Sequence, residues 1–288
     1  MNKTPISKII LEGREFLVKR DDLFDPYLSG NKYRKLHTLL KTPKEHYNKI
    51  ISYGGTQSNA MLAIAALAKQ KGWVFEYYTK PLSKKQKEQE EGNYPIALSL
   101  GMQHYELELE SYKVYVQALR LNLDPMCVVV DQGGADRMAQ EGVAVLAQEI
   151  QEESLEFEAI ATPSGTGTTA LYLALAFPQY KVYTTAAIGD KGYLEEQMSA
   201  LSSIPSNLVI LEPQKKYHFA KPYKELYEFY KHLKYGGIEF DLLYAPLLWK
   251  LLMEQTKEKI LYIHSGGVSG NVSMEPRYKA KFPELFSL

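Results

Sequence analysis

Short apolar runs alternate along the chain with longer segments in which apolar residues recur every three or four positions. The short runs are rich in β-branched and aromatic residues, as in buried strands, and the longer segments have the period of a helix. The predicted strands cover residues 16–19, 50–53, 74–78, 126–130, 159–162, 182–187, 208–211 and 260–264. The predicted helices cover residues 58–71, 138–152, 169–176, 222–235 and 243–256. This alternation predicts an α/β fold with a mostly parallel sheet.

Length and composition fit a globular protein with two lobes. The 288 residues exceed the roughly 100–200 of one domain, and 45% apolar and 24% charged residues are near the average for globular proteins. The 34 basic and 34 acidic residues balance, and there is no basic run of the kind that binds nucleic acid. The longest apolar run, 60–68, is far shorter than the ~20 residues of a spanning helix. We therefore expect no nucleic-acid partner and no membrane insertion.

The single cysteine and the first residues bear on location. Cys127 cannot form an internal disulfide, and a chain of this size without cross-links suits a reducing compartment. Its apolar neighbours in MCVVV (126–130) predict a buried thiol rather than a nucleophile. Residues 1–10 lack the apolar region and the cleavage site of a signal peptide. These features predict a cytoplasmic protein.

Four segments place Gly, Ser, Thr and Asn at the carboxyl end of a predicted strand, where open α/β sheets bind their ligands. They are SGNKYRK (29–35), GGTQSN (54–59), SGTGTT (164–169) and HSGG (264–267). One such turn is common in proteins of any function. Four of them together predict a shared crevice.

The segment 164–169 lies between a predicted strand and an apolar helix. Its backbone N–H groups and the positive end of the helix dipole can bind a phosphate; a plain turn with capping threonines is the alternative. Gly165, Gly167 and Ala170 also match G-x-G-x-x-A, and Asp190 follows at the spacing of a ribose-binding carboxylate. An NAD-binding unit therefore stays open, whereas the Walker A pattern is absent.

Lys32 lies at the predicted start of a helix, where the helix dipole disfavours a protonated amine. A lowered pKa would let Lys32 act as a Schiff-base nucleophile, and a solvent-exposed lysine is the alternative. Lys35 follows one helical turn later and can direct its charge toward the same phosphate.

The remaining two segments offer polar side chains. Gln57, Ser58 and Asn59 can surround an anion such as a substrate carboxylate, and Ser58 or Asn59 can also cap the following helix. Ser265 can offer its hydroxyl to a ring nitrogen or cap its strand, and we expect His264 to pack within the strand. The six histidines form no metal-binding pattern, so we predict no metal.

These segments, in this order, resemble the pyridoxal-phosphate-dependent family that contains D-cysteine desulfhydrase and 1-aminocyclopropane-1-carboxylate (ACC) deaminase. The matching strings are KRDDLFDPYLSGNKYRKL (19–36), SYGGTQSNA (52–60), DQGGADRMAQEG (131–142), ATPSGTGTTAL (161–171), FDLLYAPLLWK (240–250) and ILYIHSGG (260–267). The resemblance implies a tryptophan-synthase-β-like fold, namely two domains of three α/β/α layers with mostly parallel sheets. It also implies pyridoxal 5′-phosphate as the cofactor and a homodimer. The larger, cofactor-binding domain would contain residues 1–35 and 138–288, and the smaller, inserted domain residues 36–137.

The resemblance assigns roles to individual residues. Lys32 resembles the lysine that binds the cofactor covalently and moves the substrate α-proton, and Lys35 resembles a residue near the cofactor phosphate. Asn59 matches the side chain beside the pyridine 3′-oxygen, Ser58 a hydroxyl that assists proton transfer, and Tyr244 a substrate-side tyrosine. The residues that resemble the phosphate loop are Gly165, Thr166, Gly167, Thr168 and Thr169. The residues expected around the substrate are Gln57, Ser58, Asn59 and Tyr244.

Two departures from the family pattern bear on the substrate. ACC deaminases have a glutamate that pairs with the ring nitrogen, where this chain has Ala245. D-cysteine desulfhydrases use a threonine hydroxyl near the ring nitrogen, and Ser265 keeps a hydroxyl there. A hydroxyl partner leaves the pyridine largely neutral, which suits β-elimination because the leaving group takes the electrons. The second departure is the segment 217–226, which lacks the family's longer Gly-rich HFGGYAK string and leaves the exact substrate open.

The favoured hypothesis is a lyase that converts D-cysteine to pyruvate, hydrogen sulfide and ammonia, with Lys32, Ser58 and Tyr244 as catalytic residues. Within the same chemistry, the alternatives are an ACC deaminase or another β-eliminating or racemising enzyme of this fold. From other classes, the alternatives are an NAD-binding oxidoreductase and a non-catalytic relative that binds pyridoxal phosphate.

Overall fold

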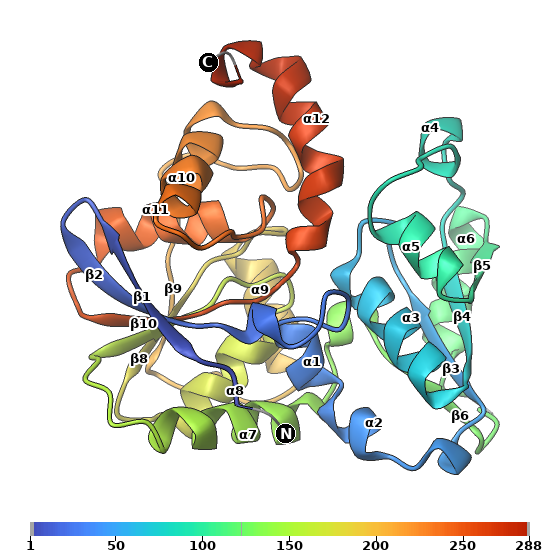
Figure 1. Ribbon diagram of the computed structural model, residues 1–288. Helices are drawn as coiled ribbons and strands as arrows, with labels where there is room; N and C mark the ends of the chain where they lie inside the picture. The colour runs from blue at the N-terminus through green and yellow to red at the C-terminus, as the bar shows by residue number, and fades with distance from the viewer. Residues whose placement is uncertain (1–2, 122, 287–288) are drawn as a thin grey trace.

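Two sheets form the framework of the protein (Figure 1). The computed structural model describes residues 3–121 and 123–286. The larger sheet has six strands in the order β1-β2-β10-β7-β8-β9, and the smaller has four in the order β5-β4-β3-β6. All described strand pairs are parallel except β1 with β2. The strands are β1 (Ile6–Leu11), β2 (Arg14–Lys19), β3 (Lys49–Tyr53), β4 (Val74–Thr79), β5 (Met102–Glu106), β6 (Cys127–Val129), β7 (Ala159–Ala161), β8 (Lys181–Thr184), β9 (Leu208–Ile210) and β10 (Ile260–Ile263).

Helices connect the strands and cover both sheets. They are α1 (Asn31–Lys35), α2 (His37–Lys41), α3 (Asn59–Lys71), α4 (Lys84–Lys87), α5 (Asn93–Ser99), α6 (Leu109–Ala118), α7 (Ala139–Gln151), α8 (Thr168–Ala176), α9 (Lys191–Ser199), α10 (Lys224–Tyr235), α11 (Ala245–Gln255) and α12 (Asn271–Lys281). Short 3₁₀ turns are η1 (Asp21–Leu23), η2 (Lys44–His46), η3 (Gln132–Gly134), η4 (Val268–Gly270) and η5 (Pro283–Leu285).

The larger unit has three layers because side chains alternate between the two faces of its sheet. In β2, Phe16 and Val18 join the apolar cluster formed with α10 and α11, whereas Leu17 joins the cluster formed with α7 and α8. In β10, Tyr262 joins the cluster formed with α10 and α11, and Leu261 joins the cluster formed with α7 and α8. Both faces are therefore buried, which is why these strands read as continuous apolar runs.

The smaller unit is built on the same plan. Ile50 in β3 packs with α3 and α5, and the next residue, Ile51, packs on the opposite face near α6. The four strands of this sheet all lie between β2 and β7 in sequence, so the smaller unit is inserted into the larger one. The predicted α/β class is confirmed. The boundaries 1–35, 36–137 and 138–288 stay a prediction, with which this strand order is consistent.

The eight predicted strands are present with small differences at their ends, and two further strands, β1 and β5, were missed. β1 is an edge strand whose face is partly exposed, so its apolar residues do not form a buried run. The predicted strand 182–187 is shorter, because β8 ends at Thr184. Helix α6 was missed because none of its residues is fully buried.

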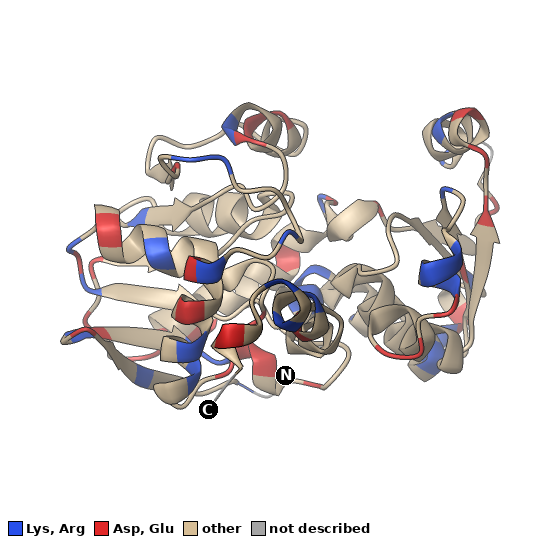
Figure 2. Ribbon diagram, turned by 90° about the horizontal axis from the view of Figure 1, so that it is seen from above, with Lys and Arg blue, Asp and Glu red and all other residues tan. Residues whose placement is uncertain are grey.

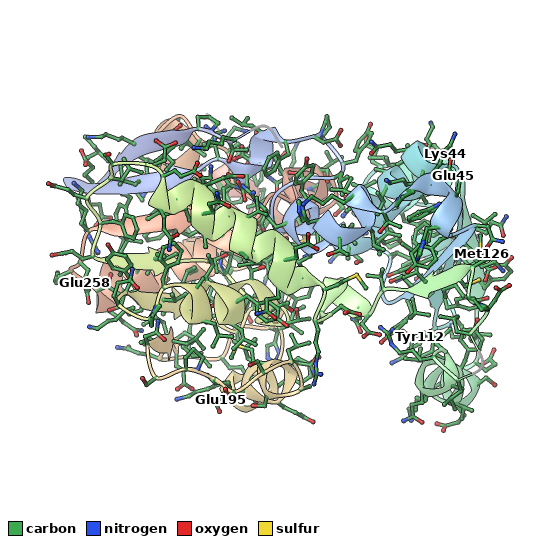
Figure 3. The ribbon with its side chains drawn as sticks, turned by 90° about the horizontal axis from the view of Figure 1, so that it is seen from below. Lys44, Glu45, Tyr112, Met126, Glu195 and Glu258 are labelled. Carbon is green, nitrogen blue, oxygen red and sulfur yellow. The ribbon has the colours of Figure 1, made fainter. Side chains whose placement is uncertain are left out.

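Surface charge is mixed over the whole molecule. Figure 2 shows acidic and basic residues interspersed on both units. Figure 3 labels the half-buried Glu195 and Glu258 on the larger unit, and the half-buried Tyr112 and the exposed Met126 on the smaller. No helix within the described residues is both long enough and apolar enough to cross a membrane.

A buried ion network joins α1 to α7. Arg34 has no exposed surface, and its guanidinium donates two hydrogen bonds of 2.9 Å to Asp21 and two of 2.7 Å to Glu149. The buried ammonium of Lys19 lies 2.9 Å from Glu149, so two cations meet two anions. Gly142 in α7 lets the helices approach, because a Cβ there would lie 1.8 Å from the Arg34 carbonyl oxygen. The KRDD string contributes Lys19 and Asp21 to this network, and the NKYRK string contributes Arg34. The glycine of the EG string is Gly142.

Replacing Glu149 with glutamine should lower the free energy of unfolding by about 3 kcal/mol, because two buried cations would then share one carboxylate. Urea unfolding monitored by fluorescence measures the change. Glu141→Gln is the matched control on the same helix: its exposed carboxylate pairs with exposed Lys41, and its loss should cost less than about 1 kcal/mol. Equal effects of the two substitutions would contradict a structural role for the network.

Candidate active site

One cavity lies where the loops after β2, β3, β7 and β10 meet. Every residue predicted for the site lines it, on both units of the molecule. These residues are Lys32, Lys35, Gln57, Ser58, Asn59, Gly165, Thr166, Gly167, Thr168, Thr169, Tyr244 and Ser265. The convergence follows from strand order, since β10 lies between β2 and β7 and the carboxyl ends of parallel strands share one edge.

Gly30 brings the lysine-bearing loop against the loop after β10. Its φ is +58°, and a Cβ at this position would lie 2.1 Å from the carbonyl carbon and oxygen of Ser265. The Asn31 N–H also donates to the Ser265 carbonyl oxygen at 3.2 Å. Any side chain at position 30 would therefore push Lys32 away from Ser265.

Lys32 has the lowered pKa that its predicted role needs. Burial lowers the pKa of its ammonium to about 8, and the nearby charge of Asp241 partly offsets this effect. Its Nζ donates to Asn31 Oδ1 at 3.0 Å. Burial, and not the helix N-terminus expected from the sequence, lowers this pKa, and α1 has only five residues. Far more of this amine is therefore unprotonated at neutral pH than in a lysine with the ordinary pKa of 10.5.

Lys35 joins the smaller unit to the predicted phosphate loop. Its Nζ donates to the Gly133 carbonyl oxygen at 3.1 Å and to Thr166 Oγ1 at 3.3 Å. Burial, together with the charge of Lys32, lowers its pKa well below the ordinary value. Neither lysine forms an ion pair with a carboxylate in residues 3–121 or 123–286. An anionic ligand would supply the missing negative charge.

The segment 164–169 has the features of a phosphate site. Helix α8 begins after Gly167, whose φ is +73°, and no side chain caps its first N–H groups. A Cβ on Gly167 would lie 2.3 Å from Met198 Cγ. The buried hydroxyl of Thr169 lines the cavity and has no hydrogen-bond partner in the described structure. Unpaired donors at a helix N-terminus beside Lys35 fit the phosphate of pyridoxal 5′-phosphate.

The alternative NAD-binding interpretation needs Asp190 in the same site, and the structure places it elsewhere. Asp190 caps α9, where its carboxylate accepts the Tyr193 N–H at 2.9 Å, and it lines a separate cavity beyond β8. The glycine loop therefore lacks the carboxylate that would bind a ribose.

Polar side chains of loop 54–59 line the cavity and also form hydrogen bonds within the protein. Ser58 Oγ accepts the Met61 N–H at 3.2 Å and caps α3, and the Ser58 hydroxyl also lies within hydrogen-bond reach of the Tyr77 phenol. The amide of Gln57 is engaged on both sides: its oxygen accepts from Ser273 at 2.7 Å and its nitrogen donates to Gln89 at 3.0 Å. Gln57 thus reaches the cavity but uses its polar atoms for contacts within the protein.

Tyr244 is positioned by a residue that the sequence analysis missed. Asp241 Oδ1 accepts the backbone N–H groups of Leu243 at 3.0 Å and Tyr244 at 2.6 Å. Its carboxylate is 2% exposed, and burial raises its pKa to about 6. Burial also raises the pKa of the Tyr244 phenol, so that it stays protonated at neutral pH. An aspartate three residues before Tyr244, just ahead of a helix, was the available signal.

The loop after β10 presents Ser265 to the cavity. His264 is fully buried: its Nδ1 accepts the Gly266 N–H at 3.1 Å, so its Nε2 donates to the Glu239 carbonyl oxygen at 2.9 Å. This neutral histidine is packed, as predicted, but it lies just after β10 rather than within the strand, and it holds the turn there. Ser265 lines the cavity, and its hydroxyl forms no hydrogen bond within the described residues. Ala245, by contrast, is the first residue of α11, is 1% exposed and lies in the apolar core.

The rim of the cavity contains side chains that sequence analysis did not find. Phe219 lines the cavity and lies 5.3 Å from the Tyr244 ring, between ring centroids. The next residue, Ala220, has a φ of +58°, a conformation that favours glycine and is strained for alanine. Tyr193 and Gln197 on α9 also line the cavity. Helix α9 is polar along most of its length, so no apolar period predicted it.

The chain is similar to known proteins in sequence and in fold. No protein-family model matches the chain. The chain is 26% identical over 295 residues to the Arabidopsis thaliana bifunctional D-cysteine desulfhydrase/ACC deaminase, covering 90% of this chain and 73% of the relative. It is 27% identical over 287 residues to a putative ACC deaminase of Thermotoga maritima, covering 90% of each. The crystal structure of an ACC deaminase homologue matches with a TM-score of 0.75 and 22% identity, covering 97% of this chain and 94% of that one.

These matches confirm the resemblance and the tryptophan-synthase-β-like fold. They also confirm pyridoxal phosphate, the cofactor of that family. The roles of individual site residues stay predictions.

The pKa of Lys32 predicts how the protein captures its cofactor. The rate at which the cofactor-free protein binds pyridoxal phosphate covalently should rise with pH through about 8 and then level off, because only the unprotonated amine attacks. Stopped-flow absorbance measures this rate, and Lys32→Ala is the control that should show no covalent phase. A rate that keeps rising toward pH 10.5, the ordinary lysine pKa, would contradict the assignment.

Proposed function

We propose that this chain, a relative of the pyridoxal-phosphate-dependent D-cysteine desulfhydrases and ACC deaminases, is a lyase that eliminates the β substituent of a small amino acid. We propose D-cysteine as the substrate, which with water gives pyruvate, hydrogen sulfide and ammonia. One observation carries the proposal: Lys32, with its pKa lowered to about 8, shares a cavity with an uncapped helix N-terminus and a second unpaired lysine.

The residues present would hold pyridoxal phosphate along its whole length. Lys32 would bind it covalently, the start of α8 with Lys35 would bind its phosphate, and Asn59 and Ser265 would contact the ring. Bound there, the cofactor supplies an electron sink for loss of the substrate α-proton. The backbone N–H groups of loop 54–59 lie at the start of α3, where a substrate carboxylate would bind.

Proton transfer falls to three side chains of the cavity. An amine with a pKa near 8 can both accept and return a proton near neutral pH, which suits Lys32 to handle the α-proton. The Tyr244 phenol stays protonated and can donate to the departing sulfur. Ser58 keeps a hydroxyl proton while its oxygen caps α3, so it can position the substrate or assist this transfer.

The choice of D-cysteine rests on the ring-nitrogen position. Ser265 offers a neutral hydroxyl at the cavity, and Ala245 is buried in the core where ACC deaminases have a glutamate. A neutral ring is a weaker electron sink, which suffices for β-elimination because sulfide leaves with the electrons. The name of the Arabidopsis relative includes D-cysteine desulfhydrase. ACC deaminase is the second candidate, because the same name and that of the Thermotoga relative include it.

A homodimer and a cytoplasmic location belong to this proposal as well. Both follow from the resemblance and from the cysteine content rather than from the contacts within one chain. Analytical ultracentrifugation of the cofactor-bound protein tests the dimer.

Product analysis separates the two substrates. The protein should release pyruvate and sulfide in equal amounts from D-cysteine, and little or no 2-oxobutyrate from ACC. Lys32→Ala should abolish the release, because it removes the residue that binds the cofactor and moves the α-proton. Release of 2-oxobutyrate as the faster reaction would move the chain to the ACC deaminase branch, and no product from either would contradict a lyase.

The hydroxyl at position 265 should matter more than the size of its side chain. Ser265→Ala should lower the rate of pyruvate release by about tenfold, the equivalent of one hydrogen bond of about 1.4 kcal/mol. Ser265→Thr, which keeps the hydroxyl, should retain most of the rate. The measurement is kcat with D-cysteine for the two variants side by side. Equal losses in both would contradict a hydrogen bond from this hydroxyl.

A further inference from the structure

Asn93 is a buried polar residue where the two units of the molecule meet. It is the first residue of α5, has no exposed surface and follows Gly92, whose φ is +102°. Its side-chain nitrogen donates to Asn59 Oδ1 at 2.8 Å and to the Gln57 carbonyl oxygen at 3.2 Å. Its side-chain oxygen accepts from the Ser269 hydroxyl at 3.0 Å. Both ends of the amide are therefore engaged.

These partners determine which way the Asn93 amide points. A backbone carbonyl can only accept, so the end of Asn93 that faces Gln57 must be the NH2 group. The same NH2 group faces Asn59, which must therefore present its oxygen to Asn93. Since an asparagine amide has two ends, the NH2 group of Asn59 is directed away from Asn93.

The freed NH2 group of Asn59 lies beside the candidate active site. Asn59 lines the cavity, and a Cβ on Gly267 would lie 2.4 Å from Asn59 Nδ2. The nitrogen of Asn59 therefore lies against the loop that also carries Ser265. Ser269 lies in η4, just after that loop, and donates to Asn93. Asn93 therefore also contacts the segment that follows Ser265.

We propose that Asn93 is a positioning residue that fixes the amide of Asn59 with its NH2 group toward the ring oxygen of the cofactor. This inference rests on the proposed function. A pyridine 3′-oxygen is a hydrogen-bond acceptor, so a flipped Asn59 would face it with a second acceptor. Asn93 does not line the cavity, and it couples loop 54–59 of the smaller unit to η4 of the larger one. Figure 1 shows α5 and α12, the helices that follow Gly92 and η4, on neighbouring sides of the two units.

A double-mutant cycle on cofactor affinity tests this role. Asn93→Asp keeps the shape of the side chain but replaces the donor toward Asn59 with an acceptor. The affinity of the cofactor-free protein for pyridoxal phosphate is read from quenching of the two tryptophans. Both Asn93→Asp and Asn59→Ala should weaken binding by about tenfold, as expected for loss of one hydrogen bond. In the Asn59→Ala background, Asn93→Asp should change the affinity by less than about twofold, because residues that act through one contact are not additive.

Two further variants separate positioning from general stability. Ser269→Ala removes only the donor to the Asn93 oxygen. It should weaken binding of pyridoxal phosphate to the otherwise wild-type protein, and it should have no further effect in the Asn59→Ala variant. It replaces Asn93→Asp in the cycle if that variant does not fold. Gln89→Ala, which removes a half-buried partner of Gln57 that does not line the cavity, is the matched control and should leave the affinity unchanged. Thermal unfolding of each cofactor-free variant gives its stability separately.

The outcomes are distinct. Independent, multiplying effects of the substitutions at 93 and 59, or unchanged affinity in Asn93→Asp, would overturn the inference while leaving the proposed function intact. A wild-type protein that binds no pyridoxal phosphate would overturn the proposed function and this inference with it.

Discussion

The guanidinium of Arg34 lies between the carboxylates of Asp21 and Glu149, with no surface exposed to solvent. Helix α1, which carries this arginine, has only five residues and cannot hold its shape alone. The ion pairs attach it to the turn after β2 and to α7, and the close approach at Gly30 and Gly142 leaves it little freedom. The two lysines of the site project from the same short helix. Their position therefore depends on this buried pairing, which would be costly to leave incomplete.

The site contains buried ionisable groups, whose charged forms are disfavoured by burial. Burial lowers the pKa of both Lys32 and Lys35, and the charge of Lys32 lowers the pKa of Lys35 further. Asp241, also buried, has a pKa raised to about 6. Since its pKa in the folded state exceeds the ordinary value of 3.8, its contribution to stability is present below about pH 4 and is lost as the pH rises through about 6. A phosphate at the start of α8 would relieve the excess positive charge, so ligand binding and stability are expected to be linked.

Most of the site could be predicted because its residues follow strands that are apolar on both faces. Such strands are visible in the sequence, and their carboxyl ends meet by the rules of parallel sheets. Asn93 could not be found in this way. It ends residues 80–93, a run of both charge signs that is typical of a solvated loop, and only tertiary contacts show that Asn93 is buried. Asp241 positions Tyr244 by accepting backbone N–H groups. The side chain of Gln57 is hydrogen-bonded to Ser273 and Gln89, which the sequence did not indicate. Contacts that cross between the two units leave no period in the sequence.

The central claim is that Lys32, and not its neighbour Lys35, carries the cofactor. Reduction of the pyridoxal-phosphate-bound protein with borohydride makes the lysine linkage permanent, and mass spectrometry of the digested protein then locates it. We predict the modification on Lys32 alone, with Lys35 unmodified because its Nζ is directed to Gly133 and Thr166. Modification of Lys35, or of surface lysines with Lys32 left free, would contradict the account.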